Sequence, residues 1–429
     1  MTSTSQRLRI VVTGLVAQHP WLGGVAWDYV QYAAGLHRLG HDVYYLEDSG
    51  EWPYTRNGGP SENDWIAHDC TPNVTHLAQV MERFGLGDRW AYRFPIKPRW
   101  FGMSHTKRRE VLSSADLLIN VSGSLKRPSD YRSVRRLAYI DSDPVFTQIK
   151  LALLRGQLKF QRRASTHDVY FTFGEQSSVA AALTPYAWQP TRQPILLSDW
   201  STSALPRPAY TTIMSWASYS PVRYRGQHYG QKDVEFRRFI GLPAQAPGVH
   251  FEVAMNSTTH AVWETGDDRD RSGSTEVDAP PRGVAVGDLL TRAGWSVVDA
   301  GAACSDLDRY RSYVQGSRAE WSIAKNGYVK GQSGWFSCRS ACYLAAGRPV
   351  VVQDTGFSRI IPTGKGVLAF NTVEEATAAV LDVEAHYASH ARAAREIAAA
   401  YFDSGQVLTH LVERAMASDT AVKIQAIGA

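Results

Sequence analysis

One segment of the sequence, residues 331–356, has the residue types that bind an anion through the peptide backbone. It begins with a loop of small residues and continues as a short helical pattern. A Gly-x-Pro stop, a buried strand pattern and a second glycine turn follow. A helix that begins in such a loop directs unpaired N–H groups, and the positive end of its dipole, at whatever lies before it. The segment therefore predicts an anion site, best suited to a diphosphate.

The groups that would donate hydrogen bonds to a diphosphate lie at the start of this segment. They belong to Ser333, Gly334, Trp335, Phe336, Ser337 and Ser340. Arg339, in the first turn of the predicted helix, adds a cation within reach of a phosphate. Lys232, which follows the first strand pattern of the second half of the chain, is a second candidate cation. A surface lysine at the start of a helix explains Lys232 equally well.

Two residues in the first half of the chain are candidates for a general base. His19 lies in a glycine-containing loop after the first strand pattern, and histidine titrates near neutral pH. Asp143 lies just past the end of a later strand pattern, where open α/β sheets bind ligands. An exposed or structural role for His19 and turn capping for Asp143 are the ordinary alternatives. Gly23 and Gly24, at the tip of the same loop as His19, would let the backbone approach a ligand or simply form a tight turn.

Apolar runs predict two successive sets of strands around these residues. The first set is 8–14, 42–46, 116–121, 137–140 and 168–173, and the second set is 211–216, 249–255, 295–299, 349–353 and 367–370. A helical pattern over 25–39 separates the first two strands. This strand–helix–strand order implies a right-handed crossover and a parallel sheet.

The chain is too long for one ordinary core, and we expect two α/β domains. The predicted boundaries are a first domain over 1–195, a Pro-rich linker over 196–208 and a second domain over 209–385. Residues 386–429 are predicted to form helices that pack across both domains. Residues 264–283 are polar and contain several glycines and prolines, so we expect a surface loop there.

Composition limits the class of protein. A hydrophobic content of 44% and a charged content of 20% are typical of soluble globular chains. No apolar run is long enough to span a bilayer, and the first residues have no apolar core of the signal-peptide kind. Four cysteines do not make a disulfide framework in a chain of this size. We therefore expect a protein of the reducing cytoplasm.

Positive charge is concentrated in residues 89–163, which hold 17 lysines and arginines against five acids. Solvated helix faces are the ordinary explanation. A surface that attracts an anionic acceptor or a phospholipid headgroup, with peripheral contact to a membrane, is the functional one. No nucleic-acid-binding motif accompanies the charge, and no nucleic acid partner is expected. The many tryptophans of the first 100 residues would suit an aromatic acceptor.

The run Ala-Ala-Gly-Arg-Pro-Val-Val at residues 345–351 resembles the donor half of GT-B glycosyltransferases, in particular the family 4 pattern found in bacteria. Two α/β halves, a linker and C-terminal helices are similar to the GT-B arrangement as a whole. The resemblance implies two Rossmann-like domains that face a central cleft. The first would bind the acceptor and the second a nucleotide sugar, and a C-terminal helix would cross back to the first.

The resemblance also implies a reaction. A hexose or deoxysugar would move from a nucleoside diphosphate sugar to a small-molecule, natural-product-like acceptor or to a lipid. A helix start and basic side chains would neutralise the diphosphate, so neither a metal nor another cofactor is expected. Lys232 lies where related enzymes carry a phosphate-binding cation. The Asp-x-Asp match at 141–143 keeps a metal site open as an alternative.

The sequence departs from the family 4 pattern at two positions. The family carries two glutamates eight residues apart, one near the sugar and one on the ribose. Gly334 and Cys342 take these places here, and neither accepts a hydrogen bond as a carboxylate does. A nucleotide-sugar epimerase on the same fold, or an inactive GT-B binding partner, therefore stays open beside a transferase. The donor sugar, the nucleotide base and the stereochemical course are open as well.

Overall fold

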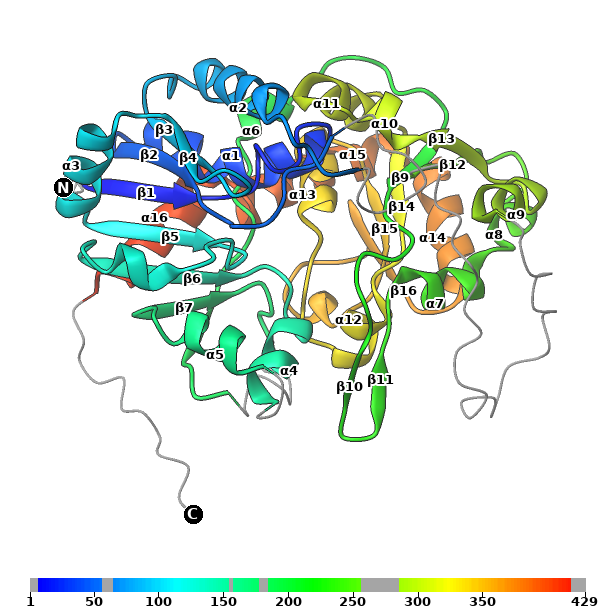
Figure 1. The fold of residues 1–429 in the computed structure, drawn as a ribbon. Coiled ribbons are helices and arrows are strands. Elements are labelled where there is room, and N and C mark those ends of the chain that lie inside the picture. Colours follow the sequence, from blue (N-terminus) through cyan, green and yellow to red (C-terminus); the bar gives the residue numbers. More distant parts are fainter. Residues whose placement is uncertain (1–6, 56–64, 154–156, 177–183, 256–284, 418–429) are drawn as a thin grey trace, which may run out of the picture.

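The computed structural model describes residues 7–55, 65–153, 157–176, 184–255 and 285–417. It contains two large β-sheets with helices packed on them, and Figure 1 shows the two sheets side by side. The predicted loop over 264–283 lies outside the described residues. The predicted domain boundaries stay a prediction; the first sheet ends at residue 190 and the second begins at residue 210.

The first sheet has the strand order β4-β3-β2-β1-β5-β6-β7-β8. Its strands are β1 (Arg9–Thr13), β2 (Asp42–Glu47), β3 (Trp90–Phe94), β4 (Arg99–Gly102), β5 (Leu117–Val121), β6 (Arg136–Asp141), β7 (Val169–Thr172) and β8 (Trp188–Pro190). All neighbours pair in parallel except β3 and β4. Its helices are α1 (Gly23–Arg38), α2 (Thr71–Arg83), α3 (His105–Ser114), α4 (Phe146–Ala152) and α5 (Leu158–Ala164).

The second sheet has the order β13-β12-β9-β14-β15-β16 and is parallel throughout. Its strands are β9 (Tyr210–Ile213), β12 (Phe251–Met255), β13 (Ser296–Asp299), β14 (Ala319–Ser322), β15 (Val350–Gln353) and β16 (Val367–Phe370). Its helices include α7 (Lys232–Phe236), α10 (Ala300–Ala303), α11 (Leu307–Gly316), α12 (Asn326–Gly331) and α13 (Cys338–Ala345). A hairpin of β10 (Val222–Tyr224) and β11 (Gln227–Tyr229) projects from this half (Figure 1).

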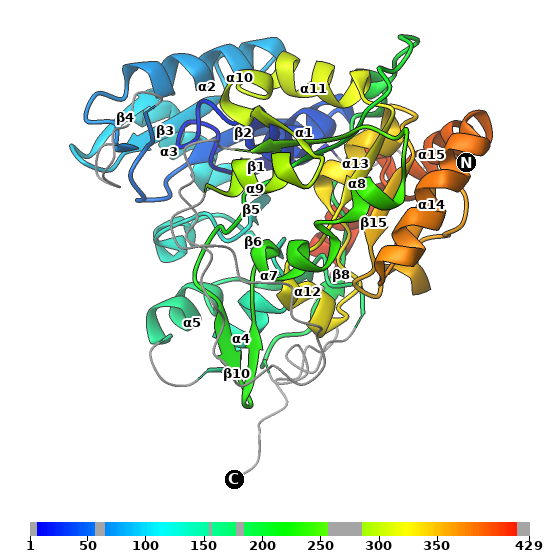
Figure 2. The ribbon, with the colours of Figure 1, turned by 90° about the vertical axis from the view of Figure 1, so that its right-hand side faces the viewer.

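Three helices close the chain: α14 (Val373–Ala385), α15 (Tyr387–Tyr401) and α16 (Ser404–Met416). Figure 2 shows α14 and α15 together on one side of the second half. The last helix, α16, returns to the first sheet, where the Arg136 guanidinium donates to the Ala415 carbonyl oxygen at 2.9 Å. A Cβ atom at Gly35 of α1 would lie 2.4 Å from Leu408 Cδ1, so α1 and α16 pack closely. The predicted crossing of a C-terminal helix to the first domain is confirmed.

The segment over 331–356 folds as its residue types predict. The helix α13 ends before Gly347, which has a φ of +70°, and the buried strand β15 follows. Gly356 then turns the chain with a φ of +92°. Glycine is favoured at both positions because it adopts positive φ without a Cβ clash.

The strand β14 was not predicted, and its residues explain why. Ala-Glu-Trp-Ser has no apolar run, although all four residues are buried. A central strand tolerates Glu320 because Arg339 pairs with it. The short strands β3, β4 and β8 and the β10–β11 hairpin were also not predicted.

The two halves share one hydrophobic core at their junction. Trp27 of α1 packs against Trp200 with ring centroids 4.8 Å apart, and its indole N–H donates to the Leu307 carbonyl oxygen at 2.9 Å. Trp200 in turn meets Tyr310 of α11 edge to face. None of the helices in the described ranges has both the length and the apolar character needed to cross a membrane.

Candidate functional site

The halves meet where the strands of both sheets end. Asp143, which follows β6, accepts hydrogen bonds from the Tyr219 hydroxyl and, at 3.2 Å, from the Lys325 ammonium group. Tyr219 follows β9 and Lys325 follows β14. The Trp335 indole N–H donates to the Ser142 carbonyl oxygen at 3.2 Å. Carboxyl ends of parallel strands are where open α/β sheets bind ligands, so this junction is the candidate site.

Three cations gather on the second half at this junction. Lys325 is paired with Asp143 and Arg339 with Glu320. Lys232, the first residue of α7, is partly buried and forms no ion pair or hydrogen bond within the described residues. Burial lowers the pKa of Lys232 well below its usual value, and the charges of Arg339 and Lys325 lower it further. An anion placed here would remove this repulsion.

Arg339 lies at the start of α13, but its guanidinium is directed at the sheet. Its nitrogens donate to the Glu320 carboxylate at 2.6 Å, to the Ile213 carbonyl oxygen at 2.5 Å and to the Ser322 hydroxyl at 2.6 Å. Glu320 is completely buried. These bonds give Arg339 a structural function in addition to the positive charge it brings to the site. Its contact with a phosphate stays a prediction.

The loop before α13 is tightly packed. Ser333 is completely buried, and its hydroxyl has no hydrogen-bond partner among the described residues. Gly334 has a φ of +79°, and a Cβ atom there would lie 2.9 Å from Ile360 Cδ1 and 3.0 Å from Gln176 Cγ. A side chain at Gly334 would displace the Ile360 and Gln176 side chains, so close packing occupies the space around this glycine.

The two aromatic residues of the loop anchor it with their side chains. The Trp335 ring stacks on Tyr328 at a centroid distance of 4.2 Å. Phe336 is buried between Phe357 and Phe402, with centroids at 5.1 Å and 5.3 Å. Only the backbone of these two residues is therefore suited to an anion.

The start of α13 has backbone N–H groups that are suited to an anion, as the sequence predicts. Ser337 is the N-cap, and its side chain caps none of the first N–H groups. The first N–H groups of a helix lack intrahelical acceptors. Ser340 is buried one turn further along. The helix start thus lies beside Lys232 and Lys325 as a second source of positive potential.

The two predicted bases lie in different surroundings. The His19 ring stacks on Tyr54 at 5.0 Å, and burial lowers its pKa to about 4. Its imidazole is therefore neutral at pH 7 and a weak base. Asp143 is held by Tyr219 and Lys325 across the junction. The role of Asp143 as a base stays a prediction.

The two predicted loop glycines belong to α1, because the helix begins at Gly23. The Gly23 N–H donates to the Cys304 carbonyl oxygen at 2.9 Å, across the junction. A Cβ atom at Gly23 would lie 2.1 Å from the Asp306 carbonyl oxygen, and one at Gly24 would lie 2.8 Å from the Tyr310 ring. Both glycines therefore allow α1 to pack against α10 and α11. Their contact with an acceptor stays a prediction.

Replacing Gly23 by alanine should destabilise the junction. The added methyl group meets backbone, which cannot turn aside, so a loss of roughly 1–3 kcal/mol is expected. Gly316→Ala is the matched control, because a Cβ atom there meets nothing within 4 Å. Thermal unfolding of both variants measures the difference. Equal midpoints would contradict the packing function of Gly23.

Sequence reasoning missed Asp28, which faces the second half from α1. Burial raises the pKa of its carboxyl group to about 7, and the charge of Arg339 opposes this rise. Asp28 follows Gly24 by four residues and so shares its helix face. This four-residue spacing from Gly24 is the feature of the sequence from which Asp28 could have been predicted. The junction thus contains a carboxyl group that exchanges a proton near neutral pH.

Groups of potential metal ligands occur at two places. Asp141 is buried and accepts a hydrogen bond from Thr172 at 3.1 Å, while Asp143 pairs with Lys325. Within the described ranges, the one group of three close metal-ligand side chains is Asp382, His386 and His390. Asp382 of α14 already pairs at 2.8 Å with His386, which lies between the two helices, and at 3.2 Å with His390 of α15. Metal-independent chemistry stays a prediction.

Comparisons with known proteins give the fold. Neither a protein-family model nor a curated protein matches the sequence. A solved α-glucosyltransferase in complex with UDP and DNA is 12% identical, with a TM-score of 0.59 over 96% of this chain and 100% of that chain. The fold is GT-B. HepE from Anabaena with UDP-glucose is 12% identical, with a TM-score of 0.55 over 95% and 99%. Sucrose-phosphate synthase from Thermosynechococcus elongatus is 12% identical, with a TM-score of 0.52 over 95% and 98%. The predicted GT-B fold is confirmed.

Proposed function

We propose that this GT-B protein is a glycosyltransferase that uses a nucleoside diphosphate sugar as donor. The observation that carries the proposal is Lys232, a partly buried cation that forms no ion pair or hydrogen bond within the described residues, beside Lys325, Arg339 and the start of α13. The similar α-glucosyltransferase and HepE were solved with UDP and UDP-glucose. Uridine nucleotides are therefore the first donors to test.

The same residues suggest how transfer would proceed. As the bond between the sugar and the diphosphate breaks, negative charge develops on the departing nucleotide. A preorganised cation and free backbone N–H groups stabilise such charge. Lys232 and the first turn of α13 would supply both without a metal ion. The acceptor would approach from the first half, and Asp28 is the candidate for removing its proton.

Calorimetric titration with UDP, GDP, TDP and ADP tests donor binding. Absence of binding by all four would contradict the proposal. Incubation with UDP-glucose alone then separates the alternatives. Slow release of UDP by transfer to water supports a transferase, an isomeric sugar nucleotide indicates an epimerase, and binding without any product indicates an inactive partner.

At a pH above the lowered pKa of Lys232, binding of UDP should take up a proton. In the free protein the pKa of Lys232 is well below its usual value because of burial, and a bound diphosphate would restore it. Affinity should therefore fall as the pH rises from this lowered pKa towards about 10.4, the ordinary lysine value. Calorimetry in two buffers of different ionisation enthalpy measures the uptake directly. Proton release, or an affinity that rises with pH, would contradict this function of Lys232.

A further inference from the structure

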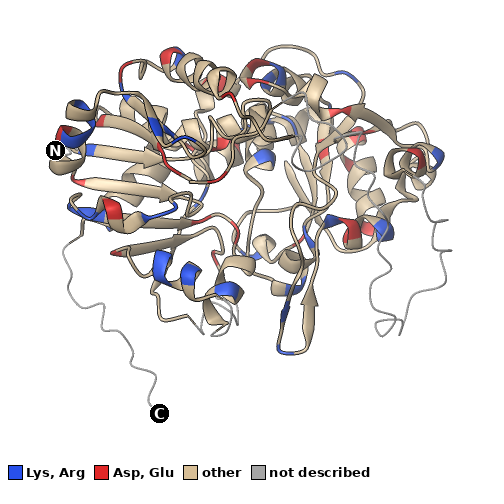
Figure 3. Cartoon of the chain, in the orientation of Figure 1, with Lys and Arg blue, Asp and Glu red and all other residues tan. Residues whose placement is uncertain are grey.

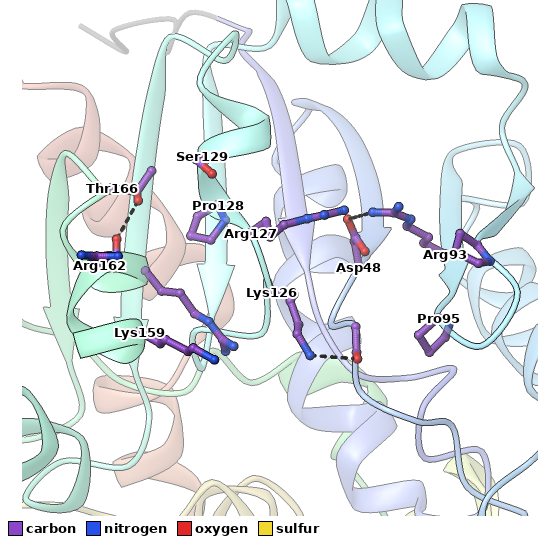
Figure 4. A pocket seen from close by; sticks show the side chains of 13 residues that line it. Asp48, Arg93, Pro95, Lys126, Arg127, Pro128, Ser129, Lys159, Arg162 and Thr166 are labelled. Atoms are coloured by element: carbon purple, nitrogen blue, oxygen red, sulfur yellow. Dashed lines mark hydrogen bonds and ion pairs between the residues drawn. The ribbon is translucent and has the colours of Figure 1, made fainter. Parts of the chain in front are cut away.

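A basic pocket opens in the first half of the protein, on residues that the donor site does not use. Its volume is about 630 Å³. Six cations line it: Arg93, Lys126, Arg127, Lys159, Arg162 and Arg163. In Figure 4, Arg93 and Arg127 lie beside Asp48, the single acid of the lining, whereas Lys159 and Arg162 lie at the other side of the pocket. The pocket therefore carries a strong excess of positive charge.

Within the described residues, acids near the pocket neutralise half of these cations. Arg93 lies 3.4 Å from Asp48, Lys126 lies 3.6 Å from Glu51, and Arg127 lies 3.1 Å from Asp130. Two of these acids, Glu51 and Asp130, are exposed, so their attraction is weakened by water.

The other three cations belong to α5 and form no ion pair in the described part of the chain. They are Lys159, Arg162 and Arg163. Figure 3 shows this helix as a basic element. Like charges three and four residues apart repel each other on a helix, and α5 has only seven residues. A bound anion would offset this repulsion.

The pocket lies in the first half of the protein, which is the half predicted to bind the acceptor. Asp48 follows β2, Arg93 lies in β3, and Lys126 follows β5, so the pocket opens at the carboxyl ends of parallel strands. Asp143 follows β6 at the same edge of this sheet and contacts the donor half. The pocket thus extends from this edge of the sheet, which contacts the donor half, to Arg162, Arg163 and Thr166, which precede β7.

We propose that this pocket binds a phosphate group carried by the acceptor. The proposal rests on the glycosyltransferase function and adds the chemical class of the acceptor. Arginine is well suited to phosphate because its guanidinium donates two parallel hydrogen bonds. A volume of about 630 Å³ admits a sugar phosphate or a lipid headgroup.

The test compares two double variants of equal charge. Arg162→Gln/Arg163→Gln removes two pocket cations, and Arg109→Gln/Arg135→Gln removes two exposed arginines of the same half that do not line the pocket. Glucose 6-phosphate, by calorimetry, represents a soluble source of phosphate. Phosphatidylcholine vesicles with and without phosphatidic acid, by sedimentation, represent a lipid source.

The proposal expects one or both phosphate probes to bind about tenfold or more weakly to the pocket variant and normally to the control variant. Failure of both probes to bind, or equal losses in both variants, would overturn it. A single-stranded DNA oligonucleotide that binds more tightly than both probes, and loses affinity in the pocket variant, would also overturn it. UDP separates the two proposals: its affinity should depend on Lys232 and not on Arg162 and Arg163. Phosphate binding without UDP binding would therefore refute the donor site alone.

Discussion

Replacing Lys232 by methionine should weaken the binding of UDP about a hundredfold or more. Methionine keeps most of the length and volume of the side chain but removes its charge. Loss of one partner from a desolvated charge pair costs several kcal/mol of binding free energy. The remaining cations cannot compensate, because Arg339 is engaged by Glu320 and Lys325 by Asp143. Calorimetric titration with UDP measures the effect.

The stability of the same variant separates lost binding from misfolding. Lys232 has a lowered pKa in the folded protein because of burial, so its charge destabilises the fold at neutral pH. The methionine variant should therefore unfold at the same temperature as the wild type or higher. Lys365→Met, at an exposed position, is the matched control and should change neither property. Unchanged UDP affinity in the Lys232 variant would remove this residue from the donor site.

Replacing Arg339 by alanine should destabilise the second half by about 3–5 kcal/mol, because it leaves a buried carboxylate unpaired. Glu320 is completely buried in β14 and has Arg339 as its ion-pair partner. The variant also removes the donors to Ile213 and Ser322. Thermal and urea-induced unfolding of the full chain measures the loss.

The double variant Arg339→Ala/Glu320→Gln tests whether the unpaired Glu320 carboxylate causes the loss of stability. It removes the buried charge together with its partner, so it should recover a substantial part of the lost stability. If it recovers stability but still fails to bind UDP, Arg339 contributes directly to the donor site. If the single variant is as stable as the wild type, the Glu320 pair has no structural function.

The part of the fold that the sequence predicts depends on interactions between residues that are close together in the chain. The loop, helix, glycine and strand over 331–356 depend on residues adjacent in the chain, and the structure contains each of them. The same holds for the buried apolar strands on either side of α1. The strand β14 was not predicted, because its buried Glu320 is stabilised by Arg339, which lies on another element.

In the candidate site, too, some features depend on neighbouring residues and others on contacts between distant segments. Residue types and spacing determined that a helix begins in a small-residue loop at Ser337, and that Lys232 and Asp143 follow strands. Only the tertiary structure decided which charges are neutralised. Arg339 is directed at Glu320 and Asp143 is paired with Lys325, 182 positions away, so Lys232 has no ion-pair partner in the part of the chain that the structure describes. The physical reason is that charge pairing and desolvation depend on contacts between distant segments, whereas helix starts and glycine turns depend on neighbours in the chain.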